Sequence, residues 1–111
     1  ADVAISIHQN SYVSESSKGA QVFYYKKSEE GKKLAGIIQR YMLEEVDSSN
    51  KRVEKADSTY YMLLHTSVPT VIVECGFLSN PGEADKLNND SYQQKIAHAI
   101  HGGVIEYLTE H

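Results

Sequence analysis

The sequence predicts an α/β domain whose sheet is mostly parallel, twisted and flanked by helices. Short apolar runs rich in β-branched or aromatic residues stand at 3–8, 20–25 and 70–75, and segments with helical periodicity separate or follow them. With 111 residues, the chain is expected to form a single domain, 1–111. Three strands make a thin sheet for so many helical faces. We therefore expect N-terminal strands of the full domain to precede Ala1, and this chain to be its C-terminal part.

The first half of the chain predicts strand, loop, strand and helix. Residues 3–8 are too short and too evenly apolar for an amphipathic helix, and the serine-rich stretch 10–19 is expected to be a loop. After the strand at 20–25, Ser28 is the predicted N-cap of a helix that continues to about Val46. Its expected buried face follows helical spacing and comprises Leu34, Ile37, Ile38, Tyr41 and Met42.

The second half predicts a strand between two polar or ambiguous segments, and then two helices. Residues 47–57 are expected to be a loop, and 59–65 fit either a short strand or a helical turn. A strand follows at 70–75, and Asn80-Pro81 predicts the start of a short helix. A closing helix is expected to begin at Asp90 and to bury Tyr92, Ile96, Ile100, Val104 and Leu108. Gly102 and Gly103 within it predict close backbone packing.

Composition excludes several classes of function. A net charge of −4 with no basic run argues against a nucleic-acid or anionic-membrane partner. No apolar stretch approaches the ~20 residues of a membrane span. One cysteine cannot form an internal disulfide.

Two of the predicted strands end in residues that carry chemistry. His8 ends the first apolar run, and Glu74 lies at the end of the run at 70–75. The carboxyl ends of strands in an open α/β sheet form the ligand crevice. An imidazole there can bind zinc, and a neighbouring carboxylate can act as general base toward water. The alternative is structural: His8 is a core histidine, and Glu74 is ion-paired to Arg52 or a lysine.

Longer motifs around these residues resemble one enzyme family. The segments 6–10 (SIHQN), 19–25 (GAQVFYY) and 73–80 (VECGFLSN), with the closing helix around 95–103, are similar to zinc-dependent N-acetylmuramoyl-L-alanine amidases of the Amidase_3 family. The resemblance runs from about residue 2 to residue 108, and the segment around Glu74 is its most specific part. Cysteine after that glutamate, with Pro81 after Asn80, is similar to the spore-cortex, germination-specific branch.

The resemblance implies a peptidoglycan hydrolase that cleaves the amide between the lactyl group of N-acetylmuramic acid and L-alanine by zinc-activated water. It implies that His8 is a metal ligand and Glu74 the catalytic residue. The family's first zinc histidine and its ligand glutamate have no counterpart here, and both would precede Ala1. Since catalytic zinc normally has three protein ligands, we predict that this chain alone does not hold Zn²⁺ tightly and is inactive as an isolated fragment.

Other candidate residues favour structural roles. His98 and His101 are expected on a solvated or half-buried helix face, and Cys75 is expected to be buried and inert. His65 is expected to be structural, and Arg52 to be a solvated loop charge, with a carboxylate or the substrate's stem peptide as its alternative partner. Tyrosines 24, 25, 60 and 61 are expected to pack in the core or at edges rather than to stack on sugars.

Two further functions remain open at this point. One is a catalytically inactive module of the same fold that binds the cell wall or a partner, and the other is a different α/β hydrolase. The expected partner is peptidoglycan or a muropeptide, at an extracytoplasmic location in the cell wall or spore cortex. An exposed sheet edge would also predict self-association or pairing with an N-terminal companion fragment.

Overall fold

The protein is described by a computed structural model covering residues 2–10, 20–46, 50, 52–57, 68–77 and 89–110. Within these residues the order of elements is β1 (Ala4–Asn10), β2 (Gln21–Tyr25), α1 (Glu29–Glu45), β3 (Lys55–Asp57), β4 (Thr70–Phe77) and α4 (Asp90–Glu110). The predictions for 11–19, 59–65 and the helix at Asn80-Pro81 lie outside the described residues.

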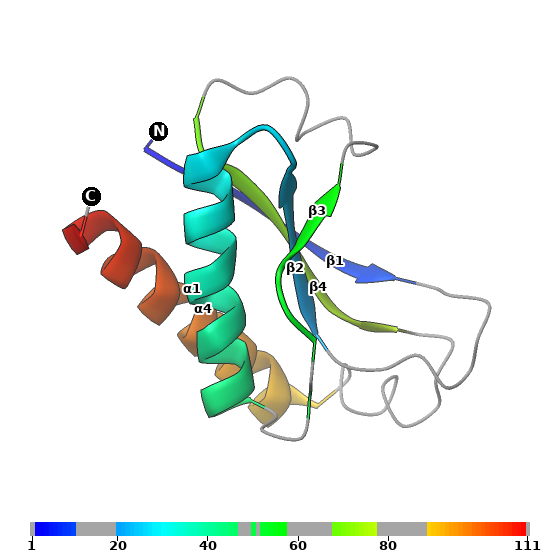
Figure 1. Ribbon diagram of the computed structural model, residues 1–111. Helices are drawn as coiled ribbons and strands as arrows, with labels where there is room; N and C mark the ends of the chain where they lie inside the picture. Colours follow the sequence, from blue (N-terminus) through cyan, green and yellow to red (C-terminus); the bar gives the residue numbers. More distant parts are fainter. Residues whose placement is uncertain are drawn as a thin grey trace.

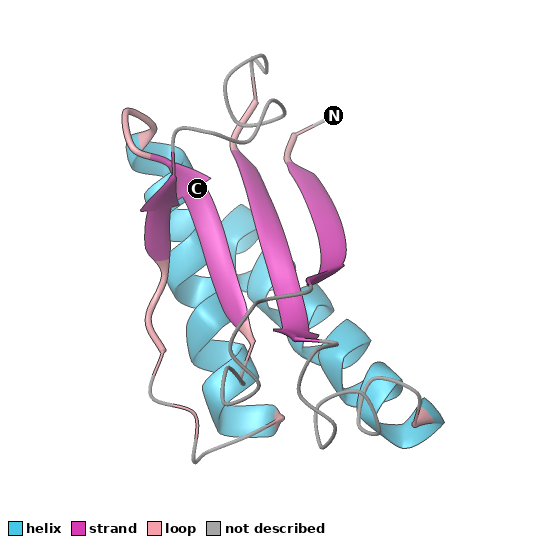
Figure 2. Cartoon of the chain, turned by 90° about the vertical axis from the view of Figure 1, so that its right-hand side faces the viewer, coloured by secondary structure: helices cyan, strands magenta, loops and turns pink. Residues whose placement is uncertain are grey.

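Four strands form one sheet in the order β1-β4-β2-β3. β1 pairs with β4, and β2 with β3, in parallel, as the prediction of a mostly parallel sheet requires. The middle pair, β2 with β4, is antiparallel. The helix α1 provides the crossover between the parallel strands β2 and β3. Figure 1 shows α1 and α4 on one side of the sheet, and Figure 2 shows the opposite face toward the viewer.

The hydrophobic core lies between this sheet and the two helices. Alternate residues of β4 and of β2 with the residue before it point toward the helices and join the buried cluster, namely Val71, Val73, Cys75, Ala20, Val22 and Tyr24. The edge strand β1 contributes only partly buried residues to the core, and its Ile7 is 59% exposed. Within the described sheet, β1 therefore presents an open and partly apolar edge.

The helix α1 forms as the sequence predicts. The Ser28 side chain accepts a hydrogen bond from the Gly31 backbone N–H at 2.9 Å, and Val46 closes the helix. Leu34, Ile38 and Met42 are buried, and the other two predicted residues pack partly buried against the core. The side chain of buried Gln39 makes hydrogen bonds to backbone groups at the start of β2. Its Oε1 accepts from Val22 N at 2.7 Å, and its Nε2 donates to Ala20 O at 3.1 Å.

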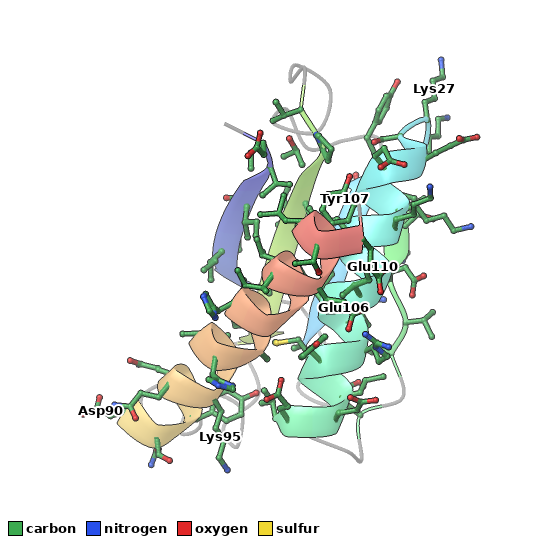
Figure 3. The ribbon with its side chains drawn as sticks, turned by 90° about the vertical axis from the view of Figure 1, so that its left-hand side faces the viewer. Lys27, Asp90, Lys95, Glu106, Tyr107 and Glu110 are labelled. Carbon is green, nitrogen blue, oxygen red and sulfur yellow. The ribbon has the colours of Figure 1, made fainter. Side chains whose placement is uncertain are left out.

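The closing helix α4 begins at Asp90, as predicted, and Asn89 is its cap, because its side-chain oxygen accepts a hydrogen bond from the Tyr92 N–H at 3.1 Å. Its buried face differs from the prediction at one position. Leu108 is 41% exposed, and Tyr107 is buried in its place. Residues placed only at steps of four drift about 40° per step around a helix of 3.6 residues per turn, so the buried face mixes steps of three and four. Figure 3 shows Glu106, Tyr107 and Glu110 in the C-terminal half of α4.

The close packing predicted at Gly102 and Gly103 is confirmed. A Cβ at position 103 would lie 2.8 Å from Ile38 Cγ1, and one at position 102 would lie 2.8 Å from Tyr41 Cε1. The prediction of a loop over 47–57 is wrong for Lys55–Asp57, which forms β3. These three residues carry no apolar alternation, and their strand exists because β2 offers a parallel partner. No helix in the described part of the chain is long and apolar enough to cross a membrane.

Candidate functional site

His8 and Glu74 occupy the same position in two neighbouring strands. They are Cα partners in the parallel pairing of β1 with β4, so their side chains leave the sheet on the same face. This face is opposite the helices, because Val73 and Cys75 point into the helix-covered core. The structure thus brings together the two residues that the sequence singled out, although they are separated by most of the chain.

The two side chains differ in their surroundings. Glu74 has no exposed surface, and a carboxylate buried to this extent is costly unless interactions or a function compensate. His8 is half-buried, and its Nε2 lies 2.9 Å from Ser6 Oγ on the same strand face. A hydrogen bond to one ring nitrogen fixes the orientation of an imidazole and is a common support for a metal-binding histidine.

His8, Glu74, Gln21 and Arg52 form a row of polar side chains, which we call the polar row. Gln21 was not identified from the sequence as part of the site. Gln21 is the Cα partner of Glu74 in the antiparallel pairing of β2 with β4, and it is almost fully buried. Its Oε1 accepts a hydrogen bond of 2.9 Å from Arg52 Nη1. The expectation of a solvated loop charge at Arg52 is therefore wrong: the residue is half-buried beside the sheet. A glutamine at the start of a predicted strand was the only signal available for Gln21.

Among the described residues, no group of three or more histidine, cysteine, aspartate or glutamate side chains is arranged to hold a metal ion. His8 and Glu74 offer one imidazole and one carboxylate, which fits part of a catalytic zinc centre but falls short of its usual three protein ligands. His98 is largely exposed and lies 3.1 Å from Glu45 Oε1, and His101 is exposed on the same helix. His65 and His111 lie outside the described residues.

Cys75 is buried on the opposite face from Glu74, as predicted. Burial, and secondarily the charge of Glu74, raises the pKa of the Cys75 thiol to about 12. A thiol with this pKa is almost wholly protonated near neutral pH, and the thiolate is the nucleophilic form. Cys75 is therefore a core-packing residue and not a candidate nucleophile. Tyr24 is likewise a core residue, and Tyr25 is half-buried, whereas tyrosines 60 and 61 lie outside the described residues.

Comparison with known proteins gives one consistent result. Residues 1–106 match a family described as N-acetylmuramoyl-L-alanine amidase (Amidase_3). The chain is 37% identical over 110 residues to the germination-specific N-acetylmuramoyl-L-alanine amidase of Bacillus subtilis, covering 99% of this chain and 46% of that protein. It is 32% identical over 109 residues to the amidase LytC of the same organism, covering 96% of this chain and 22% of LytC.

Solved structures agree with the sequence comparison. The CwlD amidase of Clostridioides difficile, solved in complex with the GerS lipoprotein, matches with a TM-score of 0.97 and 39% identity, over 100% of this chain and 56% of that one. An N-acetylmuramoyl-L-alanine amidase of Clostridium difficile 630 matches with a TM-score of 0.89 and 32% identity, over 98% of this chain and 59% of that one. The chain thus spans about half the length, or less, of the proteins it matches.

Proposed function

Because this chain belongs to the N-acetylmuramoyl-L-alanine amidase family, we propose that the protein containing it hydrolyses the amide between the lactyl group of N-acetylmuramic acid and L-alanine in peptidoglycan. The observation that carries the proposal is the pairing of His8 with Glu74 on one face of the sheet. The motif resemblance implies that His8 is a metal ligand and Glu74 the catalytic residue. One relative is named a germination-specific amidase and another a probable cell wall amidase, and we propose that this protein acts in the cell wall or the spore cortex, outside the cytoplasm.

Zinc is part of this proposal, with His8 as one ligand and the remaining ligands in residues that precede Ala1. A bound zinc ion would lower the pKa of water toward ~7 and polarise the scissile carbonyl. Ser6 would hold the His8 ring in a fixed orientation by its contact with Nε2. The chain by itself is expected to bind Zn²⁺ only weakly.

Glu74 would move the proton that this hydrolysis requires. As general base, its carboxylate takes a proton from the attacking water, and as general acid it then gives that proton to the departing amine of L-alanine. The buried position of Glu74 removes competing contacts with bulk water and holds the carboxylate in one place. Its rigid β-strand support suits a group that must stay within hydrogen-bond reach of the reacting atoms.

The test is a Glu74→Gln substitution in the full-length protein, assayed by release of L-alanine amino groups from purified peptidoglycan. We expect activity to fall by about 100-fold to 10,000-fold, the range for loss of a general acid–base group, with an unchanged circular dichroism spectrum. Near-normal activity would contradict the role of Glu74. If the wild-type protein, loaded with zinc, sediments with peptidoglycan but releases no amine, the inactive binding module replaces this proposal.

A further inference from the structure

Arg52 is held in place by a set of hydrogen bonds at the end of the polar row. Its backbone N–H donates to Asn50 Oδ1 at 2.9 Å, and Asn50 Nδ2 donates to the Ala20 carbonyl at 2.9 Å. Its Nη1 donates to Gln21 Oε1, while Gln21 Nε2 donates to the Val53 carbonyl at 2.8 Å. Both functional groups of the buried Gln21 amide are therefore used to position the segment that carries Arg52.

The row has a definite order across the sheet. His8 on β1, Glu74 on β4 and Gln21 on β2 are successive Cα partners on the same face, and the Arg52 guanidinium donates a hydrogen bond to Gln21. Neighbouring strands lie ~4.8 Å apart, so Gln21, which accepts the hydrogen bond from the guanidinium, stands one strand spacing from Glu74. A cation is thus fixed within reach of a small peptide whose reacting amide lies at Glu74.

We propose that Arg52 is a substrate-binding residue that recognises a carboxylate in the peptide part of the substrate, an inference that rests on the proposed function. A peptide that leaves the scissile amide in the direction of β2 passes Gln21 and reaches Arg52 with its next residue. The second residue of the stem peptide is linked through its side-chain carboxyl, which leaves its α-carboxyl as either a carboxylate or a carboxamide. A guanidinium matches a carboxylate with two parallel hydrogen bonds, and it makes a weaker contact with a carboxamide.

A purely supporting role for Arg52 predicts a different outcome. If the guanidinium served only to join the segment at 50–53 to β2, or to balance the charge of Glu74, its loss would affect every substrate equally. Discrimination between two substrates that differ only in this one group is therefore the informative quantity. It is also independent of the fraction of protein that folds, because misfolded protein contributes to neither rate.

The experiment uses the full-length, zinc-loaded protein and two synthetic substrates whose side-chain carboxyl is capped as a methylamide, N-acetylmuramyl-L-alanyl-D-glutamate γ-methylamide and N-acetylmuramyl-L-alanyl-D-isoglutamine γ-methylamide. We expect the wild type to prefer the carboxylate, and Arg52→Gln to raise KM for the carboxylate by about tenfold while changing KM for the carboxamide little. Arg52→Lys, which keeps the positive charge but cannot form two parallel hydrogen bonds, is expected to retain part of the preference. Lys95→Gln, on the exposed face of α4, is the matched control for loss of one positive charge.

Equal kcat/KM of the wild type for both substrates, or an equal loss on both in Arg52→Gln, would overturn the inference. Binding of the two dipeptides to the Glu74→Gln protein, measured by calorimetry, separates it from the proposed function. If the Glu74→Gln protein binds the carboxylate dipeptide more tightly than the carboxamide, and Arg52→Gln removes this preference, the role of Arg52 is supported whether or not the protein cleaves the substrate. If the wild type cleaves both substrates without preference, the proposed hydrolase activity is supported and the proposed role of Arg52 is contradicted.

Discussion

Gly103 in α4 lies directly against the backbone of Ile38 in α1. A Cβ built at position 103 would stand 2.8 Å from Ile38 Cγ1 and 3.1 Å from Ile38 Cα. Because a backbone atom cannot move aside as a side-chain tip can, this contact sets how closely the two helices approach each other. The helix pair covers the face of the sheet opposite His8 and Glu74 and so supports the strands that carry them.

Gly103→Ala is expected to destabilise the fold by about 1–3 kcal/mol through overpacking, in spite of the better helix propensity of alanine. Unfolding of the full-length protein in urea would measure the change. Gly36→Ala in α1 is the matched control, because its Cβ would meet only the carboxylate end of the flexible Glu54 side chain at 3.0 Å. That control is expected to be neutral or slightly stabilising. Equal effects at the two positions would contradict the role of the close contact.

Gln39→Leu is expected to lower the free energy of unfolding by about 2 kcal/mol or more, because it leaves the buried Val22 N–H without its acceptor. The same substitution removes one of the donors to the Ala20 carbonyl. Chemical denaturation measures the change, with Gln93→Leu on the exposed face of α4 as a control for the same replacement. A stability equal to that of the wild type would show that water or another group replaces the glutamine at no cost.

Ser6→Ala is expected to weaken zinc binding by the full-length protein by about 10-fold to 100-fold, the usual cost of losing a group that orients a ligating histidine. Competition with a chelator of known affinity measures this change without depending on catalysis. Ser91→Ala, on the exposed first turn of α4, controls for loss of a hydroxyl elsewhere. An unchanged zinc affinity would remove Ser6 from the site.

The Cys75 thiol is expected to resist alkylation by iodoacetamide in the folded protein at about pH 8 and to react rapidly once the protein unfolds. Burial raises its pKa from 9.0 to about 12, so the unfolded state loses the thiol proton first as pH rises. The contribution of Cys75 to stability is thus present below about pH 9 and is lost as pH rises toward about 12. Comparison of denaturation midpoints across this window with those of Cys75→Ala isolates the thiol. Fast alkylation of the native protein would contradict its burial.

Much of the fold follows from local patterns. The apolar runs predicted β1, β2 and β4, and Ser28 predicted the start of α1, because burial of alternating or helical faces leaves a clear mark on neighbouring residues. β3 was missed because its residues have no such mark and depend on the partner strand. Tyr107 is buried in place of the predicted Leu108 because the neighbouring elements that pack on a long helix decide which of its residues are buried.

By itself, the sequence determined which residues are candidates for chemistry, since a histidine and a glutamate at the ends of apolar runs are costly placements visible in the chain. It also carried the family motifs around Glu74. Only the tertiary structure decided that His8, Glu74 and Gln21 are successive partners on one face, and that Arg52 stands beside them. The physical reason is that strand order, direction and register come from contacts between distant segments, which no local spacing of residues records.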